Sequence, residues 1–321
     1  MRKLIIQIPC FNEEQSLPIT LADLPREVPG IDKVEWLIID DGSTDRTVEV
    51  AAECGVDHIV RLPHNHGLAK AFAVGLDACL RKGADVIVNT DADNQYCAGD
   101  IPKLIAPILQ GRAEIVVGQR PIEQIRHFSP AKRILQRLGS WIVRLASSTS
   151  VPDAPSGFRA FSRDAAMRLN VFSGYTYTLE TIIQAGHKNM GITSVPIRTN
   201  PFLRPSRLMT SMYRYIRSSI LIIVRIFMTY QPARFFGAPG VVAFLIGFGL
   251  AVRFIIFYLS GTGQGHIQSL IFSALFMGSG FFLIVTGLVS DLIAVNRKLL
   301  EEVRTRVLRI EYRIGSIRER E

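Results

Sequence analysis

Short apolar runs alternate with amphipathic stretches over the first 120 residues of the chain. Apolar runs of four to six residues predict strands at 3–8, 34–39, 58–62, 85–89 and 114–118. Helical spacing of the apolar positions between them predicts helices at about 13–24, 44–54, 67–82 and 100–110. Buried strands separated by helices indicate an α/β fold with a mainly parallel sheet that is covered on both faces.

The pattern becomes less regular between about residues 130 and 200. This part contains a basic helical stretch, "PAKRILQRLGSWIVRLA" (130–146), and then the loop-like stretch "VPDAPSGFRAFSR" (151–163). One further strand is predicted in "GITSVPI" (191–197).

The chain becomes strongly apolar after residue 207. Residues 207–230 combine arginines with Met, Tyr, Ile and Leu, which is typical of a helix lying in a membrane interface. The runs 235–259 and 267–290 are each long enough to span a bilayer, and only Arg253 interrupts them with a charge. The loop between them has no Lys or Arg, whereas both outer flanks are rich in these residues. The positive-inside rule therefore predicts that the N-terminal part and the C-terminal tail are both cytoplasmic.

Composition agrees with a membrane-anchored protein. The net charge is +9, but the basic residues cluster beside the apolar runs, which favours an anionic membrane surface over nucleic acid as the partner. The four cysteines lack metal-ligand spacing, so we expect reduced thiols in a cytosolic domain. Small residues at Gly247/Ala251 and Ala274/Gly278 permit close helix packing, within one chain or in a homo-oligomer.

These patterns divide the chain into four expected parts. We expect a cytoplasmic domain, an amphipathic juxtamembrane region, two transmembrane helices and a charged helical tail, at 1–206, 207–232, 233–294 and 295–321 respectively.

Acidic loops follow three of the predicted strands. They are "IPCFNEE", "IIDDGSTD" and "NTDADNQ", and all three lie where the carboxyl ends of parallel strands meet and ligands bind. Asp91 and Asp93 end an apolar strand, where carboxylates are disfavoured unless they have a partner. Two carboxylates, with the amide oxygen of Gln95, suit Mg²⁺ or Mn²⁺ carrying a diphosphate. The alternative is an ordinary surface turn.

Other candidate sites are weaker. The glycine cluster "GTGQG" lies between the two spans rather than between a strand and a helix, so it is not a phosphate-binding loop. His64 and His66 lack further ligands nearby, which argues against a histidine metal site. Gly67 and Lys70 either start a helix or contact the diphosphate.

In their order and spacing, six motifs resemble family 2 glycosyltransferases with the GT-A fold. They are "IPCFNEE", "IIDDGSTDRT", "HNHGLAKA", "NTDADNQ", "VVGQR" and "DAPSGFRAFSR", and they cover roughly residues 1–210. Within the family, the chain is most similar to the dolichyl-phosphate mannose synthase and polyisoprenyl-phosphate glycosyltransferase branch. The resemblance implies transfer of a hexose from GDP-mannose or UDP-glucose, or a related nucleotide sugar, to polyisoprenyl phosphate, with inversion.

The resemblance also implies roles for individual residues. The nucleotide sugar would be bound by Pro9, Phe11, Glu13, Asp41, Lys70, Asp91 and Arg207. The metal would be held by Asp91, Asp93 and Gln95. The lipid phosphate would be bound by Arg120, Arg133 and Arg137, although Arg137 occupies a position where the family has a serine. "FLRPSRL", which contains Arg207, also departs from the glycine–acid–serine–lysine run usual at that place.

Asp93, Asp153 and Arg120 are the residues expected to act in catalysis. Asp153 matches an acidic position of the family and has three readings: a base, a residue that orients Arg159 or the sugar, or an acid in a turn. Two other functions stay open. A polysaccharide synthase of the same superfamily usually has a Gln-x-x-Arg-Trp motif, which this sequence lacks, and a non-catalytic sugar-nucleotide binder would not need the complete set of metal and phosphate positions.

Overall fold

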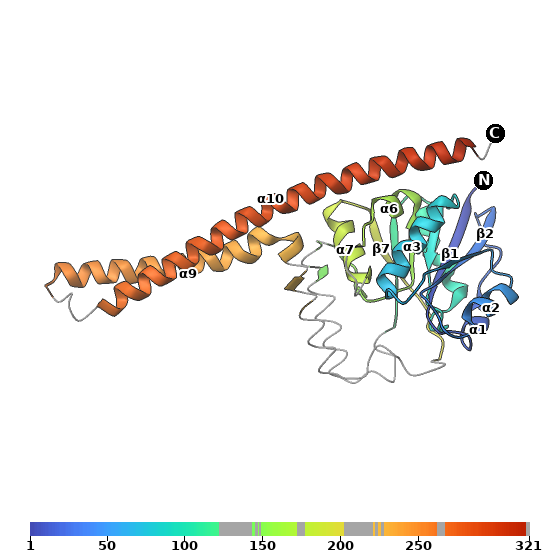
Figure 1. Ribbon diagram of the computed structural model, residues 1–321, viewed down its shortest axis with the longest axis horizontal. Helices are drawn as coiled ribbons and strands as arrows, with labels where there is room; N and C mark the ends of the chain where they lie inside the picture. The colour runs from blue at the N-terminus through green and yellow to red at the C-terminus, as the bar shows by residue number, and fades with distance from the viewer. Residues whose placement is uncertain are drawn as a thin grey trace. The chain divides into compact units, whose positions relative to one another are not determined.

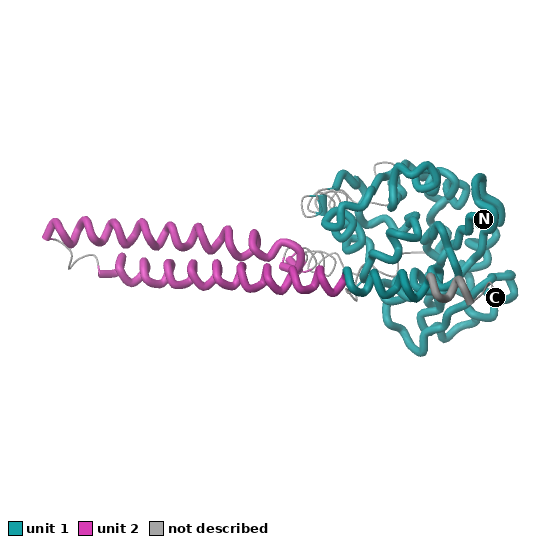
Figure 2. Tube along the Cα trace, turned by 90° about the horizontal axis from the view of Figure 1, so that it is seen from above, with its two compact units in different colours: residues 1–219, 302–321 teal, residues 220–301 magenta. Residues whose placement is uncertain are grey.

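The computed structural model of the chain describes residues 1–121, 143–144, 147, 149–171, 177–201, 221, 224–225, 228–261 and 267–318. The chain forms two compact units, coloured separately in Figure 2. The first, called the sheet unit, comprises residues 1–219 and 302–321, and the second, called the helical pair, comprises residues 220–301.

The sheet unit is built on a seven-stranded sheet in the order β3-β2-β1-β4-β6-β5-β7 (Figure 1). The strands are β1 (Lys3–Cys10), β2 (Lys33–Asp40), β3 (His58–Arg61), β4 (Val86–Asn89), β5 (Ile115–Gln119), β6 (Arg159–Ser162) and β7 (Ile192–Pro196). Every pairing is parallel except those of β6, which runs antiparallel to both β4 and β5. The predicted α/β fold with a mainly parallel sheet is confirmed, and β6 is a strand that the sequence pattern did not predict.

Helices cover both faces of the sheet. They are α1 (Leu17–Asp23), α2 (Thr47–Glu53), α3 (Leu68–Arg81), α4 (Ile101–Leu109), α6 (Arg163–Arg168) and α7 (Tyr177–His187), with a short 3₁₀ turn at Ala98–Asp100. Residues of α1, α2 and α4 pack with Leu4, Ile6 and Ile8 on one face. Residues of α3, α6 and α7 pack with Ile5 and its neighbours on the other face. Because both faces are buried, β1, β2 and β4 consist of nearly continuous apolar residues.

The antiparallel direction of β6 determines where its preceding loop lies. Arg159, the first residue of β6, is opposite Asn89, the last residue of β4. The loop that leads into β6, residues 153–157, therefore reaches the same edge of the sheet as the loops that leave the parallel strands. "DAPSGFR" thus joins the three acidic loops at this edge.

The end of helix α10 (Ile267–Arg318) belongs to the sheet unit. Tyr312 is 9% exposed and packs with the α3 face of the core, next to Leu308. Its hydroxyl donates a hydrogen bond of 2.9 Å to Asp77 Oδ1 on α3, and Arg81 lies 3.6 Å from Glu311. The tail was predicted as a charged helix, and this contact with the sheet unit was not anticipated.

Tyr312→Phe is expected to lower the free energy of unfolding by about 1 kcal/mol, because it removes the hydrogen bond to Asp77 and keeps the buried ring. The unfolding midpoint of the full chain in detergent micelles measures the change. Tyr258→Phe is the matched control, since Tyr258 is 67% exposed. An unchanged midpoint for Tyr312→Phe would contradict the docking of the tail.

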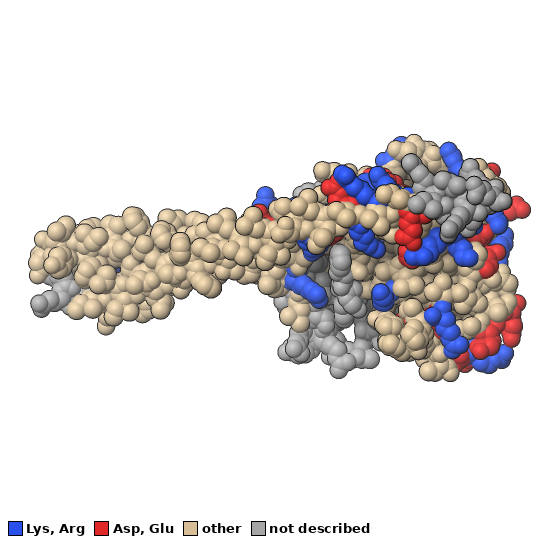
Figure 3. Space-filling model, turned by 45° about the horizontal axis from the view of Figure 1, so that its top comes forward, with Lys and Arg blue, Asp and Glu red and all other residues tan. Residues whose placement is uncertain are grey.

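The helical pair consists of α9 (Pro232–Leu259) and the first part of α10. Both helices are long and apolar enough to cross a membrane. They approach closely at glycines: a Cβ on Gly247 would lie 2.6 Å from Met277 N, and one on Gly280 would lie 2.5 Å from Phe244 N. Gly247 and Gly278 were both predicted to permit close helix packing. Gly247 does so, whereas a Cβ on Gly278 would have no atom within 4 Å. On the face drawn in Figure 3, charged side chains gather on the sheet unit and leave the described helical pair largely uncharged.

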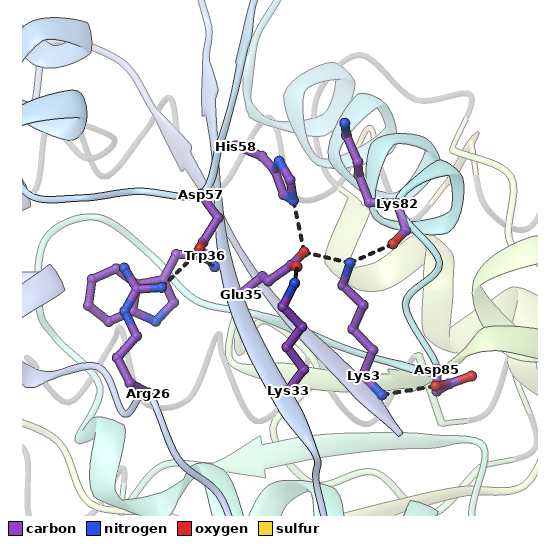
Figure 4. Close-up of polar contacts among 9 residues, drawn as sticks. All are labelled: Lys3, Arg26, Lys33, Glu35, Trp36, Asp57, His58, Lys82 and Asp85. Carbon is purple, nitrogen blue, oxygen red and sulfur yellow. Dashed lines mark hydrogen bonds and ion pairs between the residues drawn. The ribbon is translucent and has the colours of Figure 1, made fainter. Parts of the chain in front are cut away.

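A buried carboxylate lies at the opposite edge of the sheet from the acidic loops. Glu35 in β2 is 3% exposed and is surrounded by Lys3, Lys33 and His58 (Figure 4). Its oxygens lie 2.7 Å from both lysine Nζ atoms and 2.8 Å from His58 Nε2. Burial by itself raises the pKa of Glu35, but the hydrogen bonds from the three basic side chains lower it to about 2.

Glu35→Gln is expected to destabilise the protein at neutral pH, and the difference from the unsubstituted protein should shrink in acid. A folded pKa below the ordinary value of 4.5 means that the stabilisation is complete above pH 4.5 and is lost as the pH falls toward 2. This pKa difference corresponds to roughly 3 kcal/mol at pH 7. Urea unfolding between pH 7 and pH 3 measures it.

Glu53→Gln is the control for this measurement. Glu53 pairs with Arg46 at the surface, where both side chains are more than 60% exposed, so little change is expected at any pH. A difference between Glu35→Gln and the unsubstituted protein that stays constant down to pH 3 would contradict the assignment.

Candidate active site

The carboxyl ends of β2, β1 and β4 lie side by side, because these strands are neighbours in the sheet. The loops that follow Cys10, Asp40 and Asn89 therefore form one continuous edge. Of the predicted nucleotide-binding residues, Pro9 is buried near the end of β1 and Phe11 is 38% exposed just beyond it. The expectation that the three acidic loops meet is confirmed.

The first two loops are tied together by side-chain hydrogen bonds. Asn12 N donates to Ser43 Oγ at 2.9 Å, and Thr44 N donates to Asn12 Oδ1 at 2.8 Å. The next residue, Glu13, donates its N–H to Thr47 Oγ1 at 2.8 Å. Asn12 has a φ of +55°, a conformation that asparagine tolerates better than most residues. The loop carrying Phe11 and Glu13 is thus held against the start of α2.

Asp41 orders the start of helix α3. Its side chain is buried, and its two oxygens accept hydrogen bonds of 2.8 Å from the N–H groups of His66 and Gly67. Gly42 permits this arrangement, because it has a φ of +74° and any Cβ would lie 2.6 Å from the backbone of His64. Lys70 is exposed in the first turn of α3, within the segment that Asp41 positions.

Asp91, Asp93 and Gln95 lie in one tight loop after β4. Gln95 Nε2 donates to Asp91 Oδ2 at 2.6 Å, and Gln95 N donates to Asp93 Oδ1 at 3.2 Å. Burial is the main cause that raises the pKa of Asp91, and the neighbouring charge of Asp93 raises it further, to about 7. Two neighbouring carboxylates repel each other, and a bound cation would relieve this repulsion and favour the ionised form of both.

The chemistry of this loop fits a divalent metal ion. Two carboxylates are the protein ligands that Mg²⁺ and Mn²⁺ commonly take when phosphate and water complete the shell. No group of three or more His, Cys, Asp or Glu side chains suited to a metal occurs among the residues described. Gln95 meets Asp91 through its amide nitrogen, so Asp91 and Asp93 are the stronger candidates for ligands.

Asp153 forms a buried ion pair with Arg120. Arg120 Nε and Nη2 donate to the two carboxylate oxygens at 2.8 and 2.9 Å, and Arg120 N donates to Oδ2 at 3.2 Å. Asp153 is fully buried and the Arg120 side chain is 14% exposed. Burial acts to lower the pKa of Arg120, but the hydrogen bonds that Arg120 donates to Asp153 outweigh it and raise the pKa overall. The guanidinium is therefore a permanent, oriented cation beside the acidic loop.

Arg159 has a different role from the one considered for it in the sequence. The side chain is fully buried and donates to the carbonyl oxygens of Ala154, Ser156 and Thr178 at 2.6–2.7 Å. It thus holds the 153–157 loop by its backbone, while Asp153 itself grips Arg120. Burial lowers the pKa of Arg159 to about 10. From the sequence, Arg159 was considered as a partner of Asp153. Its partners in the 153–157 loop are backbone carbonyl oxygens, which a sequence motif does not indicate.

The remaining predicted residues lie outside the described residues. They are Arg133 and Arg137, predicted to grip the lipid phosphate, and Arg207, predicted to contact the diphosphate. Most of the predicted interfacial helix at 207–230 also falls there.

The sequence matches the family described as glycosyl transferase family 2 over residues 5–169. The polyprenol monophosphomannose synthase of Mycolicibacterium smegmatis is 25% identical, over 61% of this chain and 77% of the relative. The UDP-N-acetylglucosamine–dolichyl-phosphate N-acetylglucosaminyltransferase of Methanococcus voltae is 31% identical, over 60% of this chain and 83% of the relative. The undecaprenyl-phosphate mannosyltransferase of Micrococcus luteus is 29% identical, over 61% and 83%.

Solved structures share the fold. Glucosyl-3-phosphoglycerate synthase from Mycobacterium tuberculosis, in complex with Mn²⁺, UDP-glucose and phosphoglyceric acid, superposes with a TM-score of 0.55 at 22% identity. The match covers 69% of this chain and 79% of that one. At this identity the likeness establishes the architecture of the sheet unit, which is that of GT-A glycosyltransferases.

Proposed function

Because the chain belongs to glycosyl transferase family 2, we propose that it transfers a hexose from a nucleotide sugar to a polyisoprenyl phosphate at the cytoplasmic face of a membrane. The observation that carries this proposal is the meeting of two kinds of site at one edge of the sheet. A carboxylate pair suited to a metal-bound diphosphate, Asp91 and Asp93, lies beside a buried and oriented cation, Arg120. The three relatives named for transfer to polyprenyl or dolichyl phosphate support the acceptor.

The acceptor itself explains why a strong general base is not required. A phosphate monoester has its second pKa near 6, so at neutral pH its oxygen is already mostly an anionic nucleophile. The Arg120 pairing also leaves Asp153 poorly placed to take a proton. We therefore assign Asp153 to orienting Arg120, and we assign no base to the reaction.

The main obstacle is repulsion between two anions, the acceptor phosphate and the donor diphosphate. At an effective dielectric of 20, like unit charges about 4 Å apart repel by roughly 4 kcal/mol. A guanidinium has five N–H donors, and Asp153 accepts from two of those of Arg120, so others remain to face an acceptor phosphate. We propose that Arg120, with Arg133 and Arg137, binds this phosphate.

Asp91 and Asp93 would hold the Mg²⁺ or Mn²⁺ ion, which supplies charge stabilisation to the leaving diphosphate when bound. The loop of Phe11 and Glu13, the carboxylate of Asp41 and the exposed Lys70 would enclose the nucleoside and its phosphates, with Arg207. Attack by the phosphate oxygen on the anomeric carbon in one displacement inverts its configuration, through an oxocarbenium-like transition state. An α-linked donor would thus give a β-linked lipid product.

The two apolar helices support a membrane location for this reaction. A polyisoprenyl phosphate carries its chain in the bilayer and its phosphate at the surface, so an enzyme using it must work at the interface. The helical pair has the length and composition to anchor the sheet unit there. Cytoplasmic placement of the sheet unit and the tail rests on the basic flanks of the two runs.

The proposal is tested by incubating the full chain in detergent micelles with Mn²⁺, a polyprenyl phosphate and one labelled nucleotide sugar at a time. GDP-mannose and UDP-glucose are the first donors to try. Label that moves into an organic-extractable, mild-acid-labile lipid is the expected result, and the active donor names the sugar. Label that moves only to a carbohydrate acceptor would overturn the lipid acceptor, and nucleotide-sugar binding without any transfer would identify a non-catalytic binder.

A further inference from the structure

The side chain of Asn89 connects the two loops of the candidate site. Asn89 is fully buried at the end of β4, and the metal loop, residues 91–95, follows it almost at once. Its Nδ2 donates hydrogen bonds of 2.9 Å to the carbonyl oxygen of Gly157 and 3.0 Å to the hydroxyl of Tyr177. Its Oδ1 accepts a hydrogen bond of 2.9 Å from Gln7 Nε2 in β1. Both polar ends of this buried amide are therefore used.

Gly157 is the point at which the 153–157 loop meets the metal loop. A Cβ on Gly157 would lie 3.0 Å from Asp91 Oδ2 and 3.1 Å from Asp91 Oδ1. The ladder between β4 and β6 ends at Asn89, and beyond it side chains bond the Gly157 backbone. The N–H of Gly157 donates to the Tyr96 hydroxyl at 3.0 Å, and its carbonyl oxygen accepts from Asn89. Asn89 thus holds the loop where it lies against the Asp91 carboxylate.

The metal loop has a second support, which does not involve Asn89. Thr20 Oγ1 on helix α1 donates a hydrogen bond of 2.9 Å to the carbonyl oxygen of Ala92. Asn94 Nδ2 donates a hydrogen bond of 2.8 Å to Asp23 Oδ2, also on α1. These two contacts hold the metal loop from α1. We therefore expect the metal loop to keep its shape when the Asn89 amide is removed.

The 153–157 loop carries the acceptor side of the candidate site. Its first residue, Asp153, holds Arg120 through two hydrogen bonds of less than 3 Å. A shift of this loop would therefore move the guanidinium group that is proposed to bind the acceptor phosphate. A misplacement of about 1 Å that arises away from the reacting atoms can cost roughly a hundredfold in rate.

We propose that Asn89 is a positioning residue, which sets the distance between Arg120 and the metal loop by holding the carbonyl group of Gly157. This inference rests on the proposed function, in which Arg120 binds the acceptor phosphate and the metal loop binds the donor through its metal ion. The effect of Asn89 on the reaction passes through the backbone of the 153–157 loop. Loss of the amide should therefore weaken the use of the acceptor and spare the binding of the metal.

Asn89→Leu and Gln7→Met form a matched pair of variants. Each removes the hydrogen bond between Gln7 and Asn89 and leaves the other amide with an unpaired group, so both are expected to lose stability to a similar degree. Only Asn89→Leu also removes the bond to the Gly157 carbonyl. Tyr177→Phe is a second control, because it removes the other partner of Asn89 Nδ2 and keeps the bond to Gly157.

The test measures acceptor use and metal binding separately, with each variant as a full chain in detergent micelles. Initial rates of sugar transfer at varied polyprenyl phosphate give kcat and the KM for the acceptor. Titration with Mn²⁺ alone, followed by the electron paramagnetic resonance signal of unbound Mn²⁺, gives the affinity of the metal loop. Asn89→Leu is expected to lower kcat/KM for polyprenyl phosphate by roughly a hundredfold with a raised KM, and to change Mn²⁺ affinity by less than about twofold.

The split between these quantities separates positioning from a loss of folded protein. A variant that had only lost folded protein would lower kcat without raising the KM, and its Mn²⁺ sites would fall in the same proportion. Gln7→Met and Tyr177→Phe are expected to keep the KM and the Mn²⁺ affinity of the unsubstituted protein. If Asn89→Leu is too unstable to assay, the double variant Gln7→Met/Asn89→Leu replaces it, because it leaves neither amide unpaired.

Amide hydrogen exchange reports on the 153–157 loop directly. Peptides that cover this loop are expected to exchange faster in Asn89→Leu than in Gln7→Met, because the loop has lost an attachment only in the first. Equal exchange in the two variants, or equal transfer by them, would overturn the positioning role and leave the proposed function standing.

Two further outcomes also count against the inference. If Asn89→Leu loses Mn²⁺ binding as severely as it loses transfer, the defect lies in the metal loop and the positioning role is wrong. If the unsubstituted chain transfers no sugar to polyprenyl phosphate from any donor, the proposed function itself is wrong, and the role of Asn89 falls with it.

Discussion

Asp91→Asn is expected to lower the rate of sugar transfer by roughly a thousandfold while the chain stays folded. An amide fills the same space as the carboxylate but carries no charge, so the loop would keep only one of its two anionic ligands. Asp93 would then be the only negatively charged side chain of this loop left to bind the metal ion that carries the diphosphate. The measurement is the initial rate of lipid labelling at saturating donor, with Mn²⁺ varied over a wide range.

Asp32→Asn is the matched control, because Asp32 is exposed and lies before β2, at the opposite edge of the sheet. It should keep the full rate. Removal of metal by a chelator should reduce the unsubstituted protein to the level of Asp91→Asn, and the two losses should not add. A variant Asp91→Asn that works at the full rate at every Mn²⁺ concentration would contradict the role assigned to this carboxylate.

Breaking the pair between Arg120 and Asp153 is expected to have the second large effect. Asp153→Asn would leave the nearly buried guanidinium without its counter-charge, which typically destabilises a protein by about 3–5 kcal/mol. The pair is bidentate, with both contacts under 3 Å. A lysine cannot form this bidentate contact, so Arg120→Lys is also expected to lower the transfer rate. Thermal unfolding and transfer rates of each variant measure the two consequences separately.

A double-substitution cycle distinguishes the roles considered for Asp153. If Asp153 acts by orienting Arg120, then Arg120→Gln and the double variant Arg120→Gln/Asp153→Asn should have nearly equal transfer rates. If Asp153 is instead a base, its loss should slow the reaction further even when Arg120 is already absent. Additive effects of the two substitutions on the rate would thus contradict the orienting role.

The strands that the sequence predicted well are those buried on both faces. β1, β2 and β4 appear as continuous apolar runs because helices cover both sides, and the polar residues begin where each strand ends. β6 was missed because its four residues, Arg159–Ser162, begin with a charge and end with a serine. It is a strand only because β4 and β5 lie on either side of it, and this tertiary context has no signature within four residues.

The candidate site likewise contains residues whose position the sequence predicts and contacts that it does not predict. The positions of Asp91, Asp93 and Asp41 could be predicted, since a parallel sheet brings the ends of its strands together. The partner of Asp153 could not, because Arg120 is 33 residues away in the sequence and meets it only after β6 has inserted between β4 and β5.

The docking of Tyr312 also bears on the order in which the chain is made. Asp77 on α3, which Tyr312 contacts, is synthesised 235 residues earlier, and both apolar helices are translated in between. At about 5–20 residues per second, this surface waits for roughly 12–47 s during synthesis before its last partner is made. The sheet unit therefore completes its core only after both apolar helices have been translated. Chains that stop before the two apolar helices lack this part of the core.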